Sequence, residues 1–207
     1  MTKTHDARNQ PAYTLAEAAR YLKVAPATLR SWVVGRPYPK GEGVARSRPL
    51  IKPAKNPPPT LSFWNLIEAH VLRALRTEHG VPMKELRQAI QYAEKTLGID
   101  QLLLRPELRT EAGKVLLEQY GKLIDLSASG QIALRRTFSD HLARVEWDQW
   151  QFPVRLYPFI SSEGADPKQH SIAISANVAF GRPVVASRGI NTATIVQRLD
   201  AGETPAE

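Results

Sequence analysis

The 207-residue chain carries 28 lysine and arginine residues against 20 acidic residues, contains no cysteine and has a net charge of +8. Its 43% hydrophobic and 23% charged residues are typical of a soluble globular protein, which excludes wholesale disorder, collagen and long coiled coils. The lack of cysteine excludes disulfides, thiolate zinc sites, iron–sulfur clusters and cysteine nucleophiles.

Two further features bear on location. No run approaches the ~20 apolar residues that a membrane-spanning helix needs, because even residues 66–75 include Glu68, His70 and Arg73. The first ten residues have no apolar core that could serve as a signal peptide. We therefore expect a cytoplasmic protein without a membrane partner.

The positive charge is concentrated at one end. Residues 1–60 hold 11 basic and 3 acidic residues, which gives 11 − 3 = +8, whereas residues 61–207 hold 17 of each sign. Such local basicity is typical of a nucleic-acid-binding module, and a basic terminal arm that only aids solubility is the alternative.

Residues 1–12 are expected to form a disordered arm, followed by a helix-turn-helix. Thr14 and Glu17 have the spacing of a capping box, in which each residue satisfies the other's backbone amide. The helix they begin carries an apolar face and is followed by a turn at 23–25. Pro26 then opens a second helix to about Val34 that Gly35 ends, with Leu29 and Trp32 inside and Thr28, Arg30 and Ser31 directed elsewhere.

From 35 to 59 the chain is rich in proline, glycine and basic residues and cannot be helical. A short β-hairpin around Leu50-Ile51 fits this stretch, and an unstructured basic linker is the alternative. Ser62 then caps a helix over 63–79, and Pro82 begins another that runs to about Leu97.

Beyond Gly98 the pattern favours strands. We predict strands at 115–117, 123–126 and 154–159, with a helix over 131–145 between them. A polar loop at 161–170 marks a domain boundary. Short strands at 171–174 and 184–185 and a helix over 192–201 complete an α+β, mainly helical fold. We expect four parts: an arm over 1–12, a DNA-binding domain over 13–97, a middle α+β region with a small antiparallel sheet over 98–160, and a short strand-helix unit over 161–207.

The basic residues around the second helix are the candidate DNA contacts. Recognition helices place a few side chains in the major groove, while nearby basic residues neutralise phosphates. The alternative for Arg30 is a surface position on an ordinary helical hairpin. The candidate DNA-binding set is Lys23, Thr28, Arg30, Ser31, Arg36, Arg46, Arg48 and Lys52.

The N-terminal part resembles MerR-type winged helix-turn-helix proteins. The resemblance is carried by residues 13–19 (YTLAEAA), by Val24, by residues 27–32 (ATLRSW) and by residues 80–86 (GVPMKEL), and covers about residues 12–95. It implies that Thr28, Arg30 and Ser31 face DNA and that a wing follows the second helix. The stretch after that helix is longer and richer in proline than the family's wing, and Trp32 stands where tyrosine is common.

The other end resembles the small C-terminal domain of a VapB-type antitoxin family. The matching residues are 172–174 (IAI), 178–185 (VAFGRPVV), Gly189-Ile190 and the helix ending at 200–203 (DAGE). In that family the phenylalanine-glycine-arginine-proline turn precedes a homeodomain-like unit. This chain stops at Glu207, where the second helix of the unit would begin, so we expect the unit to be truncated or degenerate.

Two groups of residues are candidate partner contacts. Residues 180–185 are predicted to form a tight turn, because Gly181 permits positive φ. The turn either contacts a partner or is a structural corner without a partner. Aromatic residues also cluster over 147–159, where they form either a partner surface or the core of the middle region. The candidate partner-binding set is Phe180, Arg182, Pro183, Trp147 and Trp150.

Catalytic patterns are absent from the sequence. It contains no phosphate-binding loop, no dinucleotide fingerprint, no nucleophile elbow and no metalloprotease motif. The histidines are scattered without metal-ligand spacing. Glu146 and Asp148 are the one close carboxylate pair in an apolar setting. We expect no catalysis, no cofactor and no metal.

The leading hypothesis is a DNA-binding antitoxin and autorepressor of a VapBC-like operon. It would bind operator DNA as a homodimer and neutralise a PIN-like ribonuclease toxin, and the toxin part follows from the resemblance alone. A MerR-type regulator that senses a ligand through its middle region is one alternative. A protein-interaction adaptor that binds no particular nucleic acid is another.

Overall fold

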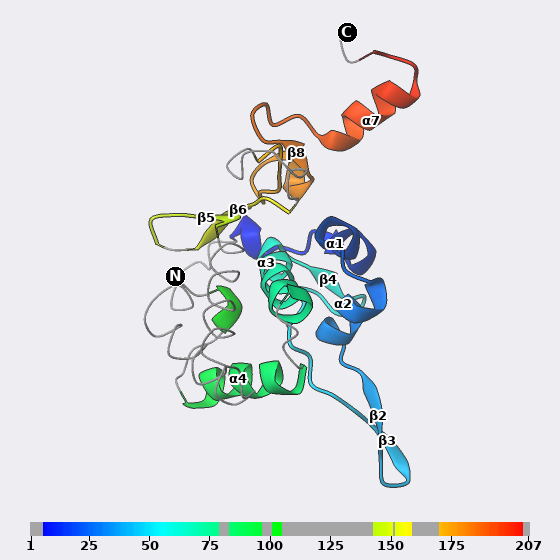
Figure 1. The fold of residues 1–207 in the computed structure, drawn as a ribbon, viewed down its shortest axis with the longest axis vertical. Helices are drawn as coiled ribbons and strands as arrows, with labels where there is room; N and C mark the ends of the chain where they lie inside the picture. Colours follow the sequence, from blue (N-terminus) through cyan, green and yellow to red (C-terminus); the bar gives the residue numbers. More distant parts are fainter. Residues whose placement is uncertain are drawn as a thin grey trace.

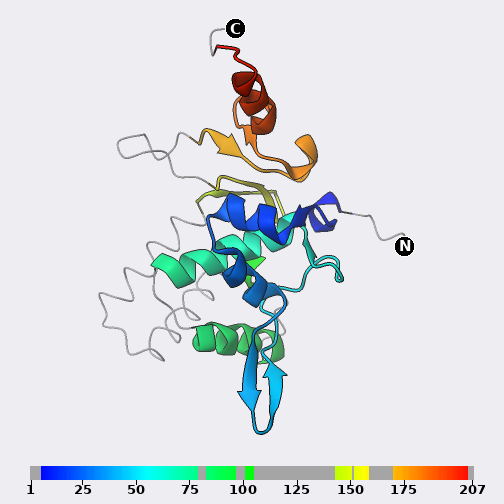
Figure 2. The same ribbon diagram turned by 90° about the vertical axis from the view of Figure 1, so that its right-hand side faces the viewer.

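A computed structural model describes residues 6–78, 83–96, 101–104, 143–150, 152–158 and 170–204. Helices surround a core in the middle of the molecule, a β-hairpin projects from one end, and the C-terminal strands and last helix extend from the other (Figures 1 and 2). The described elements form a mixed α+β structure whose sheets each pair two strands.

The predicted helix-turn-helix is confirmed. After β1 (Tyr13–Thr14), helix α1 (Leu15–Leu22) begins with the expected capping box: Thr14 Oγ1 accepts from the Glu17 amide at 3.2 Å, and Glu17 Oε2 accepts from the Thr14 amide at 2.9 Å. Helix α2 (Pro26–Val33) follows, with Pro26 in its first turn, where a missing amide costs nothing. Its Leu29 and Trp32 are fully buried, so the opposite face is left for other partners.

The β-hairpin lies earlier than predicted. Strands β2 (Pro37–Lys40) and β3 (Gly43–Arg46) pair antiparallel and are largely exposed. The expectation of a hairpin around Leu50-Ile51 is therefore wrong. Ile51 is fully buried, and the amides of both residues donate to the Trp32 carbonyl, at 2.7 and 3.1 Å. Burial of these apolar side chains against α2 outweighs their strand propensity.

Two further helices lie close to their predicted positions, and Ser62 caps the first of them as predicted. Strand β4 (Thr60–Leu61) pairs with β1 and leads into α3 (Phe63–Arg73), which a π-helical turn (Ala74–Glu78) extends. Helix α4 (Met83–Thr96) and a 3₁₀ turn, η3 (Leu102–Leu104), follow. The largest fully buried side chains of the described residues are Trp32, Tyr13, Phe63, Leu22, Leu29, Ile51, Leu61, Leu66, Ile67, Leu72 and Leu156.

The predicted helix over 131–145 does not reach its expected end. Val145 instead begins β5 (Val145–Trp147), which pairs antiparallel with β6 (Pro153–Leu156). Val145 and Leu156 are partners in this pairing, and both are buried. The predicted strands at 115–117 and 123–126 and helix residues 131–142 lie outside the described residues.

The C-terminal elements match the prediction. Strands β7 (Ile172–Ala173) and β8 (Val184–Val185) pair antiparallel on either side of a 3₁₀ turn, η5 (Ala179–Gly181). Helix α7 (Thr192–Asp200) begins at Asn191, whose side chain accepts from the Ala193 amide at 2.9 Å. Only His170 of the predicted boundary loop 161–170 is described.

From Asp6 onward, the segment predicted to be a disordered arm forms regular structure. Residues Ala7–Asn9 form a 3₁₀ turn, η1, and the Arg8 guanidinium pairs with both Asp6 and Asp148 at 2.7 Å. The same guanidinium lies over the rings of Trp64 and Phe152, 5.5 and 5.7 Å from their centroids. The Arg8–Asp148 salt bridge and the packing of Arg8 on Phe152 join this N-terminal turn to the β5–β6 sheet.

Within the described parts of the chain, every helix is too short or too polar to cross a membrane.

Candidate nucleic-acid interface and C-terminal unit

The outer face of α2 carries polar and basic side chains. Arg30 is exposed, and Thr28 and Ser31 are half-buried. The Ser31 hydroxyl donates to the Thr28 carbonyl at 2.7 Å, which holds its side chain along the helix. This division follows from the helical period, because burying Leu29, Trp32 and Val33 turns the remaining positions outward.

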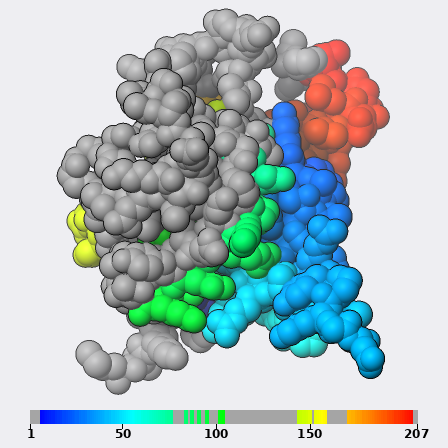
Figure 3. Space-filling model, turned by 60° about the horizontal axis from the view of Figure 1, so that its bottom comes forward, coloured from blue at the N-terminus to red at the C-terminus, as the bar shows by residue number. Residues whose placement is uncertain are grey.

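The hairpin and α2 together form one open cleft of about 520 Å³. The base of the hairpin is fixed beside α2 by two hydrogen bonds between Arg36 and Ser47: the Arg36 amide donates to Ser47 Oγ at 2.8 Å, and the Ser47 amide donates to the Arg36 carbonyl at 2.9 Å. Gly35 makes this turn at φ +81°, and a Cβ there would collide with the Ser47 carbonyl. Figure 3 shows the hairpin standing out at this end of the molecule. The residues lining the cleft are Ala27, Thr28, Arg30, Ser31, Gly35, Arg36, Pro37 and Arg46.

The cleft is electropositive. Arg30, Arg36 and Arg46 line it, and none of the described lining residues is acidic. Guanidinium groups bind phosphate and base edges through paired N–H donors, so a cleft of this composition suits a nucleic-acid backbone. The structure thus brings together the predicted residues Thr28, Arg30, Ser31, Arg36 and Arg46.

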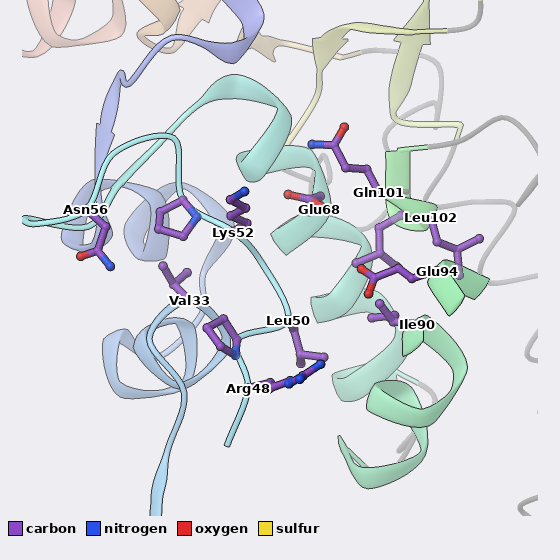
Figure 4. A pocket seen from close by; sticks show the side chains of 13 residues that line it. Val33, Arg48, Leu50, Lys52, Asn56, Glu68, Ile90, Glu94, Gln101 and Leu102 are labelled. Carbon is purple, nitrogen blue, oxygen red and sulfur yellow. The ribbon is translucent and has the colours of Figure 1, made fainter. Parts of the chain in front are cut away.

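The other predicted DNA contacts lie elsewhere. Lys23 ends α1 in a left-handed conformation at φ 51°. Arg48 and Lys52 line a separate cavity of about 820 Å³ between the segment after the hairpin and the α3–α4 side (Figure 4). The Arg48 carbonyl also accepts from the Arg87 guanidinium. Sequence spacing alone could not show that Arg48 and Lys52 lie away from Arg46. The chain leaves the hairpin where Leu50 and Ile51 bond to α2, and this long-range contact has no local pattern.

Sequence reasoning missed the exposed residues of the hairpin itself. Tyr38 is 45% exposed and Val44 78%, and Lys40 sits beside the tip, opposite Gly43. The spacing of Gly41 and Gly43, flanked by alternating prolines and β-formers, was the signal that could have placed the strands correctly.

The phenylalanine-glycine-arginine-proline turn docks on the helix-turn-helix. The buried Tyr13 hydroxyl donates to the Gly181 carbonyl at 2.9 Å, and the Arg182 guanidinium pairs with Glu17. Burial would raise the pKa of Glu17, but hydrogen bonds from Thr14 and Arg182 hold it below the usual value. Gly181 adopts φ +78°, as predicted for a turn glycine.

The candidate partner residues therefore differ in what they can contact. Phe180 is 94% exposed and is held in a left-handed conformation at φ 53°, directly after Ala179 at φ 46°. Arg182 and Pro183 are engaged within the chain: Arg182 pairs with Glu17, and Pro183 is buried and accepts from the Thr192 amide at 3.0 Å. A side chain this large and exposed on a strained backbone is typical of a contact site.

The aromatic cluster divides between core and surface. Trp147 is half-buried against the main core, and Trp150 is 69% exposed. Phe152 stacks on Trp64 with ring centroids 5.6 Å apart. Phe152 thus attaches the β5–β6 sheet to α3, whereas Tyr157 belongs to a second buried cluster with Ala173 and Val184.

The carboxylates of this region have structural partners. Asp148 accepts the amides of Trp150 and Phe152, at 3.0 and 2.9 Å, as well as Arg8. Burial acts to raise the pKa of Asp148, but these hydrogen bonds and the Arg8 charge lower it overall. Glu146 accepts from Tyr157 and Arg155. Among the described residues, no group of three or more histidine, cysteine or acidic side chains is placed to hold a metal ion.

Comparisons with known proteins agree with this geometry. A family described as "Putative DNA-binding HTH domain" matches residues 11–90. A curated relative, "Putative antitoxin VapB45" of Mycobacterium tuberculosis, is 27% identical over 212 residues, which cover 94% of this chain and 84% of the relative. The crystal structure of Rv2018 from the same organism superposes with a TM-score of 0.63 at 23% identity, over 94% of this chain and 88% of that one. The chain thus carries an N-terminal helix-turn-helix domain of a DNA-binding type and shares its overall fold with that crystal structure.

Proposed function

We propose that this protein is a DNA-binding antitoxin that represses its own operon and neutralises a PIN-like ribonuclease toxin. The N-terminal domain, with β2–β3 as a wing of the MerR type, binds operator DNA as a homodimer. The C-terminal unit, from about residue 161, holds the toxin, and residues 98–160 join the two.

The observation that carries the DNA part is the arginine-lined cleft between α2 and the hairpin. It gathers Arg30, Arg36 and Arg46 beside Thr28 and Ser31 on the face of α2 opposite its buried residues. A helix that projects short polar side chains between arginines can read base edges while its flanks hold phosphates.

Sequence preference is the test of the DNA part. The full chain is titrated with a labelled fragment from directly upstream of its own gene, at physiological salt, in competition with unrelated DNA. We expect the upstream fragment to bind at least 10³-fold more tightly than unrelated DNA, as operator-specific proteins do. Equal competition by both DNAs would reject the DNA part and is the result that the adaptor hypothesis predicts. Light scattering of the protein and of its DNA complex measures whether two chains bind each operator.

Two observations support the toxin part. The similarity to the relative named as an antitoxin extends over 94% of this chain, well beyond the helix-turn-helix. The C-terminal unit also presents apolar side chains to solvent: Phe180 at 94%, Val196 at 53%, Ile190 at 47% and Leu199 at 46% exposure. Apolar residues gathered at one end of a molecule mark a protein-binding surface.

Co-expression tests the toxin part. A ribonuclease encoded beside the gene is induced alone, with the wild-type chain, and with a Phe180→Asp variant. We expect wild type to restore growth and Phe180→Asp to fail, while both proteins bind the upstream DNA equally. Full growth rescue by Phe180→Asp would remove this residue from the toxin surface, and toxicity that persists beside wild type would reject the toxin part itself.

One observation favours a second candidate, a ligand-responsive regulator without a toxin partner. The 820 Å³ cavity beside the wing is large enough for a metabolite. This candidate predicts that no neighbouring gene product copurifies with the chain.

A further inference from the structure

The cavity bounded by the segment after the hairpin, α3, α4 and η3 combines an apolar wall with a buried acid. Val33, Leu50, Ile90 and Leu102 supply the apolar wall. Glu68 projects from α3 between the 48–56 segment and the α4 side (Figure 4). None of these residues belongs to the arginine-lined cleft.

Glu68 is almost completely buried, with 5% of its surface exposed, and has few partners. One donor among the described residues reaches it: Asn65 Nδ2 donates to Oε2 at 2.8 Å. That amide also donates to the Lys52 carbonyl at 3.0 Å, while Asn65 Oδ1 accepts from the amides of Ala54 and Ser62, both at 3.1 Å. Asn65 is therefore saturated, and Glu68 has remaining acceptor capacity at the cavity.

We propose that this cavity binds a small organic cation, whose ammonium group pairs with Glu68 and whose apolar body contacts Val33, Leu50, Ile90 and Leu102. A buried carboxylate with one hydrogen bond is stabilised most by a cationic donor. Glu94 lines the same cavity and adds a second negative charge. Arg48 and Lys52 also line it, but these two residues and Glu94 are exposed, where water screens their charges, so Glu68 is the one buried charge among the described lining residues.

The chemistry disfavours an inorganic ion as the occupant. Calcium and magnesium prefer six or more oxygen ligands, whereas much of this lining is apolar. A volume of about 820 Å³ also matches an organic ligand. The cavity wall includes Val33 at the end of α2 and the segment that follows the hairpin, so a bound ligand contacts one of the two elements that form the arginine-lined cleft.

The protonation state of Glu68 gives the site a signature. The pKa of Glu68 is raised to about 7, mainly because the carboxylate is buried; the Asn65 hydrogen bond acts to lower it and the Glu94 charge acts to raise it. A cation binds the ionised form, so binding near neutral pH must release protons. The other charged groups at the cavity are Arg48, Lys52 and Glu94, and Arg87 contacts the Arg48 carbonyl.

The test uses n-hexylamine as the probe, with n-hexanol and hexanoate as controls for the apolar chain and for charge. Calorimetry on the full chain at pH 8 is expected to give a dissociation constant in the millimolar range or tighter for the amine and at least tenfold weaker binding of both controls. Affinity for the amine should fall about tenfold from pH 8 to pH 6, with proton release visible as a heat that depends on the buffer.

Glu68→Gln tests whether the carboxylate, and not only the apolar wall, binds the amine. The substitution is conservative because the amide oxygen can still accept from Asn65. We expect this variant to bind the amine at least tenfold more weakly, without pH dependence, while hexanol binding stays unchanged. Glu94→Gln is the matched control and should lose less affinity. Equal amine binding by wild type and Glu68→Gln, tighter binding of hexanoate, or absence of the pH dependence in the wild-type chain would each overturn the proposal.

Discussion

Gly181 links the C-terminal unit to the DNA-binding domain through its backbone. It sits at φ +78°, and a Cβ at this position would overlap the Tyr13 hydroxyl that donates to its carbonyl. We predict that Gly181→Ala lowers the free energy of unfolding by about 2 kcal/mol or more, because a left-handed alanine is strained and the hydrogen bond is displaced. Thermal unfolding measures this loss.

A double mutant identifies the cause of that loss. Tyr13→Phe removes the hydroxyl, so adding Gly181→Ala to it should cost less than in the wild-type background, by about 1 kcal/mol. Strict additivity of the two substitutions would show that the hydroxyl and the glycine act independently.

Arg30 is the residue of the α2 face best placed to reach a base edge. It is exposed and lines the cleft beside Thr28 and Ser31. Arg30→Ala should weaken upstream DNA binding by about 1 to 3 kcal/mol and relax sequence preference. The matched control is Arg188→Ala, an exposed arginine of the C-terminal unit, which should leave the affinity unchanged. Equal losses of DNA affinity in the two variants would show that Arg30 acts only through its positive charge and not through contact with a base.

Glu68 gives stability a pH dependence of known sign. Its folded pKa of about 7 lies above the ordinary glutamate pKa of 4.5, so the folded chain holds a proton that the unfolded chain releases, and stability falls as pH rises between these values. Relative to Glu68→Gln, wild type should lose about 2 to 3 kcal/mol of unfolding free energy between pH 5 and pH 8. Denaturant unfolding of both proteins measures the difference, and parallel pH profiles would contradict it.

Among the elements of the DNA-binding domain, we expect the hairpin to contribute to affinity for DNA in general rather than to preference for one DNA sequence. Arg46 lies in β3 opposite Pro37, on an exposed strand at the edge of the cleft. Arg46→Gln should weaken operator and unrelated DNA by similar factors and reduce the slope of log affinity against log salt by about 0.9. A loss confined to the operator would instead make Arg46 a base-reading residue.

Local signals predicted several elements correctly. The Thr14–Glu17 capping box, Pro26 in the first turn of α2 and the Ser62 cap of α3 act over a few residues, so sequence spacing suffices to find them. The position of the hairpin and the end of the helix predicted over 131–145 depended on distant contacts. Ile51 bonds to Trp32, and Val145 pairs with Leu156.

In the candidate site, too, features set by local spacing were predictable and features set by distant contacts were not. The α2 positions follow from helical period, so Thr28, Arg30 and Ser31 were predicted to share the outward face. Arg48 and Lys52 could not be separated from Arg46 without knowing where the chain turns back to α2. The Tyr13–Gly181 contact spans 168 residues and leaves no local pattern in the sequence.

At the scale of the whole molecule, the two proposed surfaces are connected through contacts of the C-terminal unit, which include the turn at Gly181 and the hydrogen bonds between Leu156 and Ile174. The hairpin that borders the arginine-lined cleft projects from one end of the molecule, and α7, which carries the exposed Val196 and Leu199, extends from the other (Figure 1). Tyr13 and Glu17, which contact the turn at Gly181 and Arg182, also flank the start of α1. Events at the C-terminal unit therefore meet the helix-turn-helix at α1 rather than at the DNA face.

Hydrogen exchange of the full chain, with and without its upstream DNA, tests the central claim most directly, because it locates the DNA face without substitution. The account predicts slowed exchange over residues 26–47, spanning α2 and the hairpin, with little change in α7, and much weaker protection by an equal amount of unrelated DNA. Protection centred on the C-terminal unit, or unchanged exchange over 26–47 in a saturated complex, would contradict it.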